Sequence, residues 1–169
     1  MAARNALTFV GISRYICGEF YLQYWGISFY KKHNDQRKNL PPDQLHNLFV
    51  AVGWSDGSET PDMIKKGYGV PWVNSTLVIS AWDGNRLIGA VRVLSDTMFK
   101  SIIYDLMVLP EYQNKGIGKE LVKRCVEHFP NSEWLVQTEK HMAGYYEKMG
   151  FKVYDHVVLT IPSIYQSSD

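Results

Sequence analysis

One segment of the sequence, residues 105–119, combines residue types that can bind phosphate groups. An apolar strand pattern runs into a short loop, Gln-Asn-Lys-Gly-Ile-Gly at 113–118, and an amphipathic helix pattern follows directly. The first amides of a helix have no intrahelical acceptor, and its N-terminus carries partial positive charge, so this loop can hold a pyrophosphate. Gly116 and Gly118 carry no Cβ, which lets the backbone come close to the phosphate oxygens.

Two common phosphate-binding patterns do not fit this loop. The phosphate loop of nucleotide hydrolases requires glycine where Gln113 stands and serine or threonine where Glu120 stands. The dinucleotide-binding pattern requires a third glycine at the position of Leu121. What remains is a Gln-x-x-Gly-x-Gly pattern between a strand and a helix.

The elements that must position this loop form a mixed α+β pattern. Predicted strands cover residues 27–32, 77–82, 87–94, 102–109, 134–138 and 152–161, and predicted helices cover residues 41–52, 60 to 67 or 69, 116–129 and 141–149. This order predicts a sheet flanked by helices. We divide the chain into an aromatic-rich N-terminal extension, residues 1–26, and one domain, residues 27–169.

Composition narrows the class of protein. A chain of 169 residues with 46% hydrophobic and 21% charged residues predicts one globular domain and excludes a disordered chain. A net charge of +1 argues against a nucleic-acid partner. Two cysteines are too few for a tetrahedral metal site, and no apolar run is long enough to cross a membrane. We therefore expect a cytoplasmic protein with no metal and no membrane partner.

Three segments together resemble the GCN5-related N-acetyltransferase (GNAT) superfamily. They are the strand Asp-Leu-Met-Val at 105–108, the loop at 113–118 and Tyr-Tyr-Glu-Lys-Met-Gly-Phe at 145–151. The resemblance covers about residues 27–161. Within the superfamily, the chain is similar to small single-domain members, including bacterial ones of unassigned substrate and plant arylalkylamine-type enzymes. The resemblance implies a twisted, mostly antiparallel mixed sheet of about six to seven strands with about four helices.

The resemblance also implies a donor, an acceptor and a reaction. Acetyl-CoA would donate the acetyl group, and a primary amine would attack the thioester directly in a ternary complex. We favour a small amine, with aromatic amines among the candidates. The strand backbone would bind the pantetheine arm, and the Val108 N–H would stabilise the oxyanion. The implied cofactor-binding residues are Leu106, Met107, Val108, Gln113, Asn114, Lys115, Gly116, Ile117, Gly118 and Lys119.

Two residues carry the implied acid–base chemistry. Tyr146 matches the family's tyrosine that protonates the departing thiolate, since a phenol donates a proton while staying uncharged at neutral pH. Glu139, seven residues earlier, is either a base or acceptor-positioning carboxylate, or a helix cap. Asp105 is interpreted as a structural hydrogen-bonding residue.

The acceptor side is less specified. Trp54 and Trp72 either line the acceptor pocket or pack in the interior. The aromatic cluster within residues 9–30 is an arm, a lid over the substrate or a homodimer contact. Two alternatives to a small-amine enzyme remain: a protein or peptide N-acetyltransferase, and a non-catalytic acyl-CoA-binding sensor.

Overall fold

The structure is a computed structural model that describes residues 14–16, 19–24, 27–31, 38–155 and 157–161. The chain divides into two compact units, Met1–Gln137 and Thr138–Asp169.

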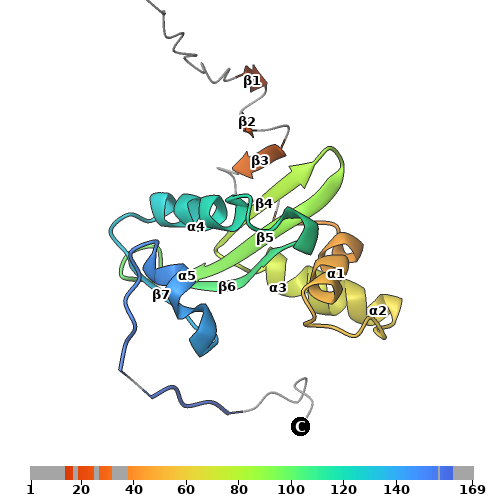
Figure 1. Cartoon of the computed structure of the whole chain (residues 1–169). Coiled ribbons are helices and arrows are strands. Elements are labelled where there is room, and N and C mark those ends of the chain that lie inside the picture. Colours follow the sequence, from red (N-terminus) through yellow and green to blue (C-terminus); the bar gives the residue numbers. More distant parts are fainter. Residues whose placement is uncertain (1–13, 17–18, 25–26, 32–37, 156, 162–169) are drawn as a thin grey trace, which may run out of the picture. The chain divides into compact units, whose positions relative to one another are not determined.

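The first unit is built on a mixed sheet (Figure 1). Its strands are β1 (Arg14–Ile16), β2 (Glu19–Tyr24), β3 (Ile27–Lys31), β4 (Leu77–Asp83), β5 (Arg86–Ser95), β6 (Lys100–Val108) and β7 (Glu133–Val136). Among the described residues they pair in sequence order, antiparallel throughout except for β6 and β7, which are parallel. The predicted α+β class with a mostly antiparallel mixed sheet is confirmed. β1 and β2 fall within the predicted extension, residues 1–26.

Helices cover this sheet and follow the predicted positions. They are α1 (Pro42–Ala51), α2 (Pro61–Ile64), the π-helical turn η1 (Lys65–Gly69), α3 (Val70–Val73), the 3-10 turn η2 (Pro110–Tyr112) and α4 (Ile117–His128). α1 packs on β5 and β6 through Leu45 and Leu48, both fully buried, and α4 packs on β4, β5 and β6. The central strands are consequently buried on both faces, as the continuous burial of residues 77–81 and 87–91 shows. No helix in the described residues is long and apolar enough to span a bilayer.

Two predictions about secondary structure were wrong. The second helix does not stop at Gly67 or Gly69, because the π-helical turn carries the chain on to Val73. Residues 152–161 were predicted as a strand, but their described part has no regular structure and exposes its apolar side chains, with Leu159 89% and Ile161 98% exposed. Alternating side chains make a strand only when a neighbouring strand pairs with the backbone, and no such pairing occurs among the described residues.

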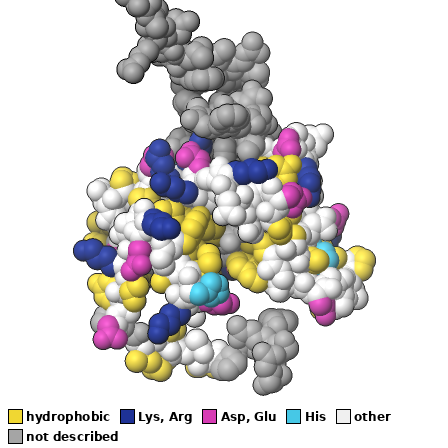
Figure 2. Space-filling model, in the orientation of Figure 1, with side chains coloured by type: hydrophobic (Ala, Val, Ile, Leu, Met, Phe, Trp, Pro, Cys, Tyr) yellow, Lys and Arg dark blue, Asp and Glu magenta, His cyan; other side chains and the backbone are white. Residues whose placement is uncertain are grey.

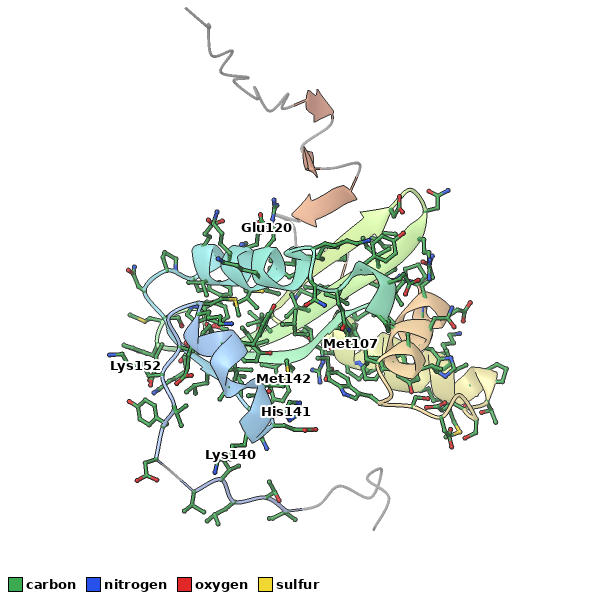
Figure 3. All side chains as sticks on the ribbon, in the orientation of Figure 1. Met107, Glu120, Lys140, His141, Met142 and Lys152 are labelled. Atoms are coloured by element: carbon green, nitrogen blue, oxygen red, sulfur yellow. The ribbon has the colours of Figure 1, made fainter. Side chains whose placement is uncertain are left out.

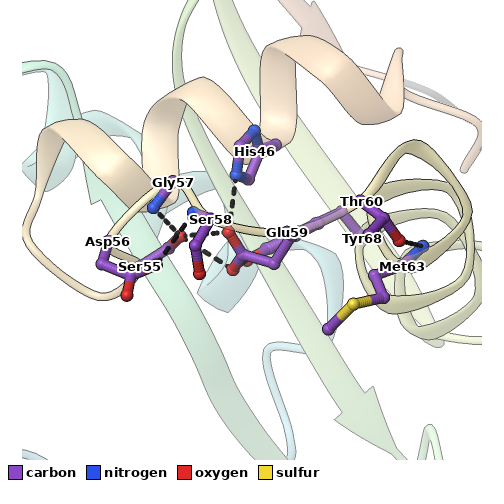
Figure 4. A network of polar contacts seen from close by, with 9 residues as sticks. All are labelled: His46, Ser55, Asp56, Gly57, Ser58, Glu59, Thr60, Met63 and Tyr68. Atoms are coloured by element: carbon purple, nitrogen blue, oxygen red, sulfur yellow. Dashed lines mark hydrogen bonds and ion pairs between the residues drawn. The ribbon is translucent and has the colours of Figure 1, made fainter.

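A polar network joins α1, the following loop and η1 (Figure 4). The Glu59 carboxylate accepts hydrogen bonds from Ser55 Oγ at 2.8 Å, from Tyr68 OH at 2.5 Å and shares a contact of 3.0 Å with His46 Nε2. The hydrogen bonds from Tyr68, Ser55 and His46, in that order of effect, lower the pKa of Glu59 to about 2. Glu59 therefore stays ionised at neutral pH and joins three segments through one carboxylate.

Aromatic side chains pack next to this network, and several apolar side chains of the same segment are exposed. Phe49 makes edge contacts with Tyr68 and Trp54, at centroid distances of 4.8 and 5.8 Å. Figure 2 shows hydrophobic and charged side chains interspersed on this side of the molecule. In the segment from α1 to α3, including the loop after α1, the exposed apolar residues are Val50, Trp54, Met63, Val70 and Val73.

Gly89 of β5 lies against both β6 and the start of α4. A Cβ at this position would lie 3.1 Å from the backbone oxygen of Met107 and 3.5 Å from a methyl group of Ile117. Since the nearest atom belongs to a paired strand, it has little freedom to yield. The close approach of β6 and α4 thus requires glycine here.

We expect Gly89→Ala to lower the free energy of unfolding by about 1–3 kcal/mol, because the added methyl overpacks this junction. Gly67→Ala is the matched control, since a Cβ there has nothing within 4 Å. The control should keep its stability or gain up to about 1 kcal/mol. Urea denaturation of both variants measures the difference, and equal stabilities would contradict the packing argument.

We expect the Glu59 network to make stability depend on acid pH. A carboxyl whose folded-state pKa lies below its unfolded-state value adds stability above the unfolded value, and this stability is lost as the pH falls toward about 2. Between about pH 5 and pH 2 the melting temperature of the wild type should therefore fall more steeply than that of Glu59→Gln. Glu127→Gln, on the exposed side of α4, is the control and should follow the wild type; parallel curves for Glu59→Gln would refute the assignment.

Candidate active site

Strand β6 extends beyond its pairing with one of its two neighbouring strands. β7 pairs with β6 only over the four positions from Lys100↔Glu133 to Ile103↔Val136, whereas β5 pairs with β6 as far as Val108. Beyond Ile103, no strand among the described residues of the first unit pairs with the β7 side of β6. Five residues, 104–108, thus present one open backbone edge, to which an extended ligand can bind as an added strand.

The register of the sheet fixes which backbone groups face this open edge. Leu109 N–H donates to the Ile88 carbonyl at 2.9 Å, so Leu109 and Met107 direct their backbone polar groups toward β5. Val108 lies between them and directs its N–H and C=O to the opposite side. Its carbonyl accepts a hydrogen bond from Gln113 Nε2 at 3.0 Å. The Val108 N–H therefore faces the open edge, where the predicted oxyanion donor belongs.

A β-bulge shapes the open edge. Arg92 faces Tyr104 and Ala90 faces Met107, so two residues of β6 lie opposite one residue of β5. Asp105, in this bulge, has φ +46°, a left-handed conformation that aspartate tolerates better than most residues. Arg92 Nε binds the Asp105 carboxylate, and its guanidinium lies 5.0 Å from the Tyr104 ring centroid. The structural role predicted for Asp105 is thus that of an anchor for the bulge.

The loop after β6 has the backbone conformation of an anion-binding site. Asn114 and Gly116 both have positive φ, +58° and +83°, and such left-handed residues turn successive N–H groups to one side. Gly116 is also the N-cap of α4, and no side chain caps that helix. The first amides of α4 consequently keep their hydrogen-bonding capacity for a ligand. A Cβ on Gly116 would meet nothing within 4 Å, so the backbone here is open to a ligand.

Side chains anchor this loop to the β4–β5 hairpin. Tyr112 OH donates to Asp83 Oδ2 at 2.5 Å, and Arg86 binds Glu111 at 2.6 Å. Lys115 Nζ lies 5.0 Å from the centroid of the Tyr112 ring. Exposed pairs of this kind add little to the free energy of unfolding. They do connect the loop to the β4–β5 hairpin. Sequence reasoning missed the hairpin contacts, since Asp83 and Arg86 lie more than twenty residues from their partners.

The predicted cofactor-binding residues lie along one continuous stretch of the first unit. Met107 and Val108 are buried at 1% and 9% exposure, with Met107 labelled in Figure 3, so their contribution to ligand binding is through the backbone. Leu106 and Gly118 are partly exposed; the exposed members are Gln113, Asn114, Lys115, Gly116 and Lys119, and Ile117 is buried. Strand and loop together thus offer backbone groups at one end and helix amides at the other.

The second unit carries the predicted acid. It contains the 3-10 turn η3 (Lys140–Met142) and α5 (Ala143–Glu147). Tyr146 on α5 is 8% exposed and packs edge-on against the rings of Tyr145 and Phe151, at centroid distances of 5.1 and 5.7 Å. Burial, with a smaller effect of Tyr145, raises the pKa of Tyr146 to about 12. The phenol is therefore fully protonated at neutral pH, as a general acid requires.

Glu139 precedes η3 in the same unit. It occupies the N-cap position of η3, yet its side chain makes no capping hydrogen bond. Instead, Glu139 Oε2 lies 3.0 Å from His141 Nδ1, and both side chains are more than two-thirds exposed. Figure 3 shows His141 on η3 beside Lys140 and Met142. The helix-cap alternative for Glu139 is thus wrong for its side chain, which pairs with His141.

The two predicted acceptor-side tryptophans differ sharply. Trp72 of α3 is 1% exposed, so its ring packs in the core and presents almost no surface to an acceptor. Trp54, directly after α1, is 55% exposed and contacts Phe49 by its edge. Of the two, only Trp54 retains accessible surface. The side chains of the aromatic cluster within residues 9–30 lie outside the described residues.

No group of three or more potential metal ligands occurs among the described residues. The single described cysteine, Cys125 of α4, is buried, and burial raises the pKa of its thiol. A neutral, buried thiol is a core residue and a poor nucleophile.

Comparisons with known proteins agree with this geometry. A family model described as "Acetyltransferase (GNAT) domain" matches residues 74–153. The chain is 28% identical over 132 residues to the uncharacterized N-acetyltransferase ycf52 of Pyropia yezoensis, covering 74% of this chain and 72% of that protein. It is 27% identical over 117 residues to GCN5-related N-acetyltransferase 1, chloroplastic, of Arabidopsis thaliana, covering 68% of this chain and 57% of that protein.

The solved structures give the same result. A GNAT-family acetyltransferase of Streptococcus pneumoniae TIGR4 superposes with a TM-score of 0.63 at 26% identity, covering 82% of this chain and 98% of that one. The matched family region contains β4 to α5, and therefore both the open edge of β6 and Tyr146. The fold, the loop and these matches together support membership of the chain in the GCN5-related N-acetyltransferase superfamily and an acyltransferase activity.

Proposed function

We propose that this acetyltransferase moves the acetyl group of acetyl-CoA to a primary amine by direct attack in a ternary complex. The observation that carries the proposal is the open edge of β6 at residues 104–108, which leads directly into the amide-lined loop at 113–118. An extended pantetheine arm pairs with the strand edge, and the pyrophosphate binds the loop and the α4 N-terminus. We propose a small amine as the acceptor, with the exposed ring of Trp54 in contact with it.

Three charge changes occur in the reaction. When the amine nitrogen bonds to the thioester carbon, the carbonyl oxygen becomes negative, and the Val108 N–H stabilises that charge. The nitrogen becomes positive at the same time and gives up a proton, for which we propose the Glu139 carboxylate as the base. Collapse of the intermediate breaks the carbon–sulfur bond and leaves a thiolate. Tyr146 then donates its proton to the sulfur, so that CoA leaves as a neutral thiol, and the phenolate regains its proton from solvent.

The net charge of the chain bears on how it binds the cofactor. A chain of net charge +1 binds a polyphosphate ligand through backbone amides rather than through a basic surface. The cytoplasmic location predicted from the sequence stays a prediction, since one relative is designated chloroplastic. A homodimer likewise stays a prediction.

We expect acceptor-dependent release of CoA from acetyl-CoA when the purified protein is tested with a panel of small amines, N-terminal peptides and histone-tail peptides. Gly118→Trp should abolish acetyl-CoA binding, because the indole fills the space beside the first helical amides. Gly67→Trp is the matched control and should bind acetyl-CoA normally, since Gly67 has open space around it. Calorimetric titration measures both affinities.

Each result of this panel has a definite meaning. Unchanged affinity in Gly118→Trp would refute the loop assignment. Release with peptides alone would replace the small amine by a protein acceptor, and saturable acetyl-CoA binding with no release for any acceptor would support a sensor.

We expect Tyr146→Phe to lower kcat by about 10²- to 10⁴-fold while leaving the affinity for acetyl-CoA nearly unchanged, as is typical when a general acid is lost. Tyr145→Phe is the matched control, since it removes the same hydroxyl from the adjacent residue and should stay close to the wild type. Because the pKa of Tyr146 is about 12, its deprotonation should cause no loss of kcat between pH 7 and pH 10. Full activity of Tyr146→Phe would show that the thiolate takes its proton from another donor.

A further inference from the structure

We infer that Gln113 is a positioning residue for acyl transfer, acting through the peptide group that follows Val108. This inference rests on the proposed function and deepens it, because it gives the side chain of Gln113 a role separate from the phosphate contacts of the loop backbone.

The chain turns sharply so that Gln113 comes back against the end of β6. Tyr112 N–H donates to the Leu109 carbonyl at 2.8 Å, and Gln113 N–H donates to the Pro110 carbonyl at 3.1 Å. These two bonds close the 3-10 turn η2, Pro110–Tyr112. The side chain of Gln113 then reaches the Val108 carbonyl, five residues back, at 3.0 Å.

This hydrogen bond completes a two-sided hold on one peptide group. The Val108 carbonyl and the Leu109 N–H belong to the same planar unit. On one side the Leu109 N–H is bonded to the Ile88 carbonyl of β5, at 2.9 Å. On the other side Gln113 Nε2 is bonded to the Val108 oxygen. With both ends bonded, the peptide plane has little freedom to rotate, and the orientation of Val108 is fixed.

Electrostatics makes this hold relevant to the reaction. In an extended residue the N–H and the C=O point to the same side of the strand, so the Val108 oxygen lies next to the N–H that serves the oxyanion. An unbonded carbonyl oxygen there would oppose the negative charge that develops in the transition state. Donation from Gln113 withdraws electron density from that oxygen. It also limits rotation of the peptide plane that adjoins Val108, whose own N–H belongs to the preceding peptide group.

The choice of residue type follows from these requirements. A glutamine amide donates hydrogen bonds without carrying a charge, whereas an ionised glutamate only accepts. The burial of the Val108 side chain, at 9% exposure, leaves the backbone as the part of this residue that faces the ligand. The first position of the Gln-x-x-Gly-x-Gly pattern thus serves the acyl end of the cofactor, while the glycines serve its phosphates.

The test compares Gln113→Met, Gln113→Glu and Gln113→Arg. Gln113→Met removes the donor at nearly the same length and should lower kcat by about 10- to 100-fold, less than the loss of an oxyanion donor itself. Gln113→Arg keeps N–H donors and should restore most of kcat. Gln113→Glu should be the least active variant at pH 8 and should recover kcat as the pH falls and the introduced carboxyl is protonated into a donor. The KM for acetyl-CoA and the Kd for CoA should change little.

Two further measurements keep this inference separate from the proposed function. Amide hydrogen exchange at Leu109, followed by NMR without acceptor, should be faster in Gln113→Met, since one side of the peptide group is released. Asn131→Leu and Asn131→Asp, at an exposed turn, make the same chemical changes and should match the wild type.

The outcomes distinguish the two ideas. Unchanged Leu109 exchange, or a loss of CoA affinity as large as the loss of kcat, would overturn the positioning role even if the protein turns over normally. A wild type that binds CoA but releases none with any acceptor, together with faster Leu109 exchange in Gln113→Met, would overturn the proposed function and, with it, a role for Gln113 in transfer.

Discussion

The candidate site depends on a mismatch in strand pairing. β6 keeps its antiparallel neighbour as far as Val108 but loses its parallel neighbour after Ile103. Backbone polar groups need partners, and the Val108 carbonyl finds one in Gln113, so the other groups of this edge are available to a ligand. The bulge at Asp105 bends β6 at this edge, while pairing with β5 continues on the other side as far as Val108. One uninterrupted stretch, residues 104–119, therefore offers strand amides first and helix amides afterwards.

Charge around the loop is arranged so that the backbone, and not the side chains, meets the anion. Glu120 lies in the first turn of α4, where a carboxylate would oppose a bound phosphate. Its partner is Arg124, 6% exposed, whose Nε lies 2.7 Å from the Glu120 carboxylate. This pairing offsets the negative charge and leaves the field of the helix N-terminus in place. A protein with net charge +1 can thus bind a polyphosphate ligand without a basic surface.

The sequence predicted those features that local residue types control. Prolines and glycines marked most element ends, and the loop at 113–118 was recognisable because glycine permits conformations that other residues avoid. Long-range pairing was not predictable: the alternation in residues 152–161 has no strand beside it among the described residues, and the Arg92–Asp105 anchor joins two strands. The Glu59 network gave no signal either, because its members are drawn together only by the packing of α1 against η1.

The acid and base halves of the proposed mechanism differ in how the chain supports them. Glu59, which is bonded to His46, Ser55 and Tyr68, is a poor base at neutral pH, since its hydrogen bonds lower its pKa to about 2. Tyr146 is a well-supported acid, because burial keeps the phenol protonated. The base proposed for the acceptor's proton is Glu139, whose exposed carboxylate lies 3.0 Å from His141 Nδ1. Glu139 is exposed to solvent whereas Tyr146 is almost fully buried, so the proposed base and the proposed acid differ in their access to water.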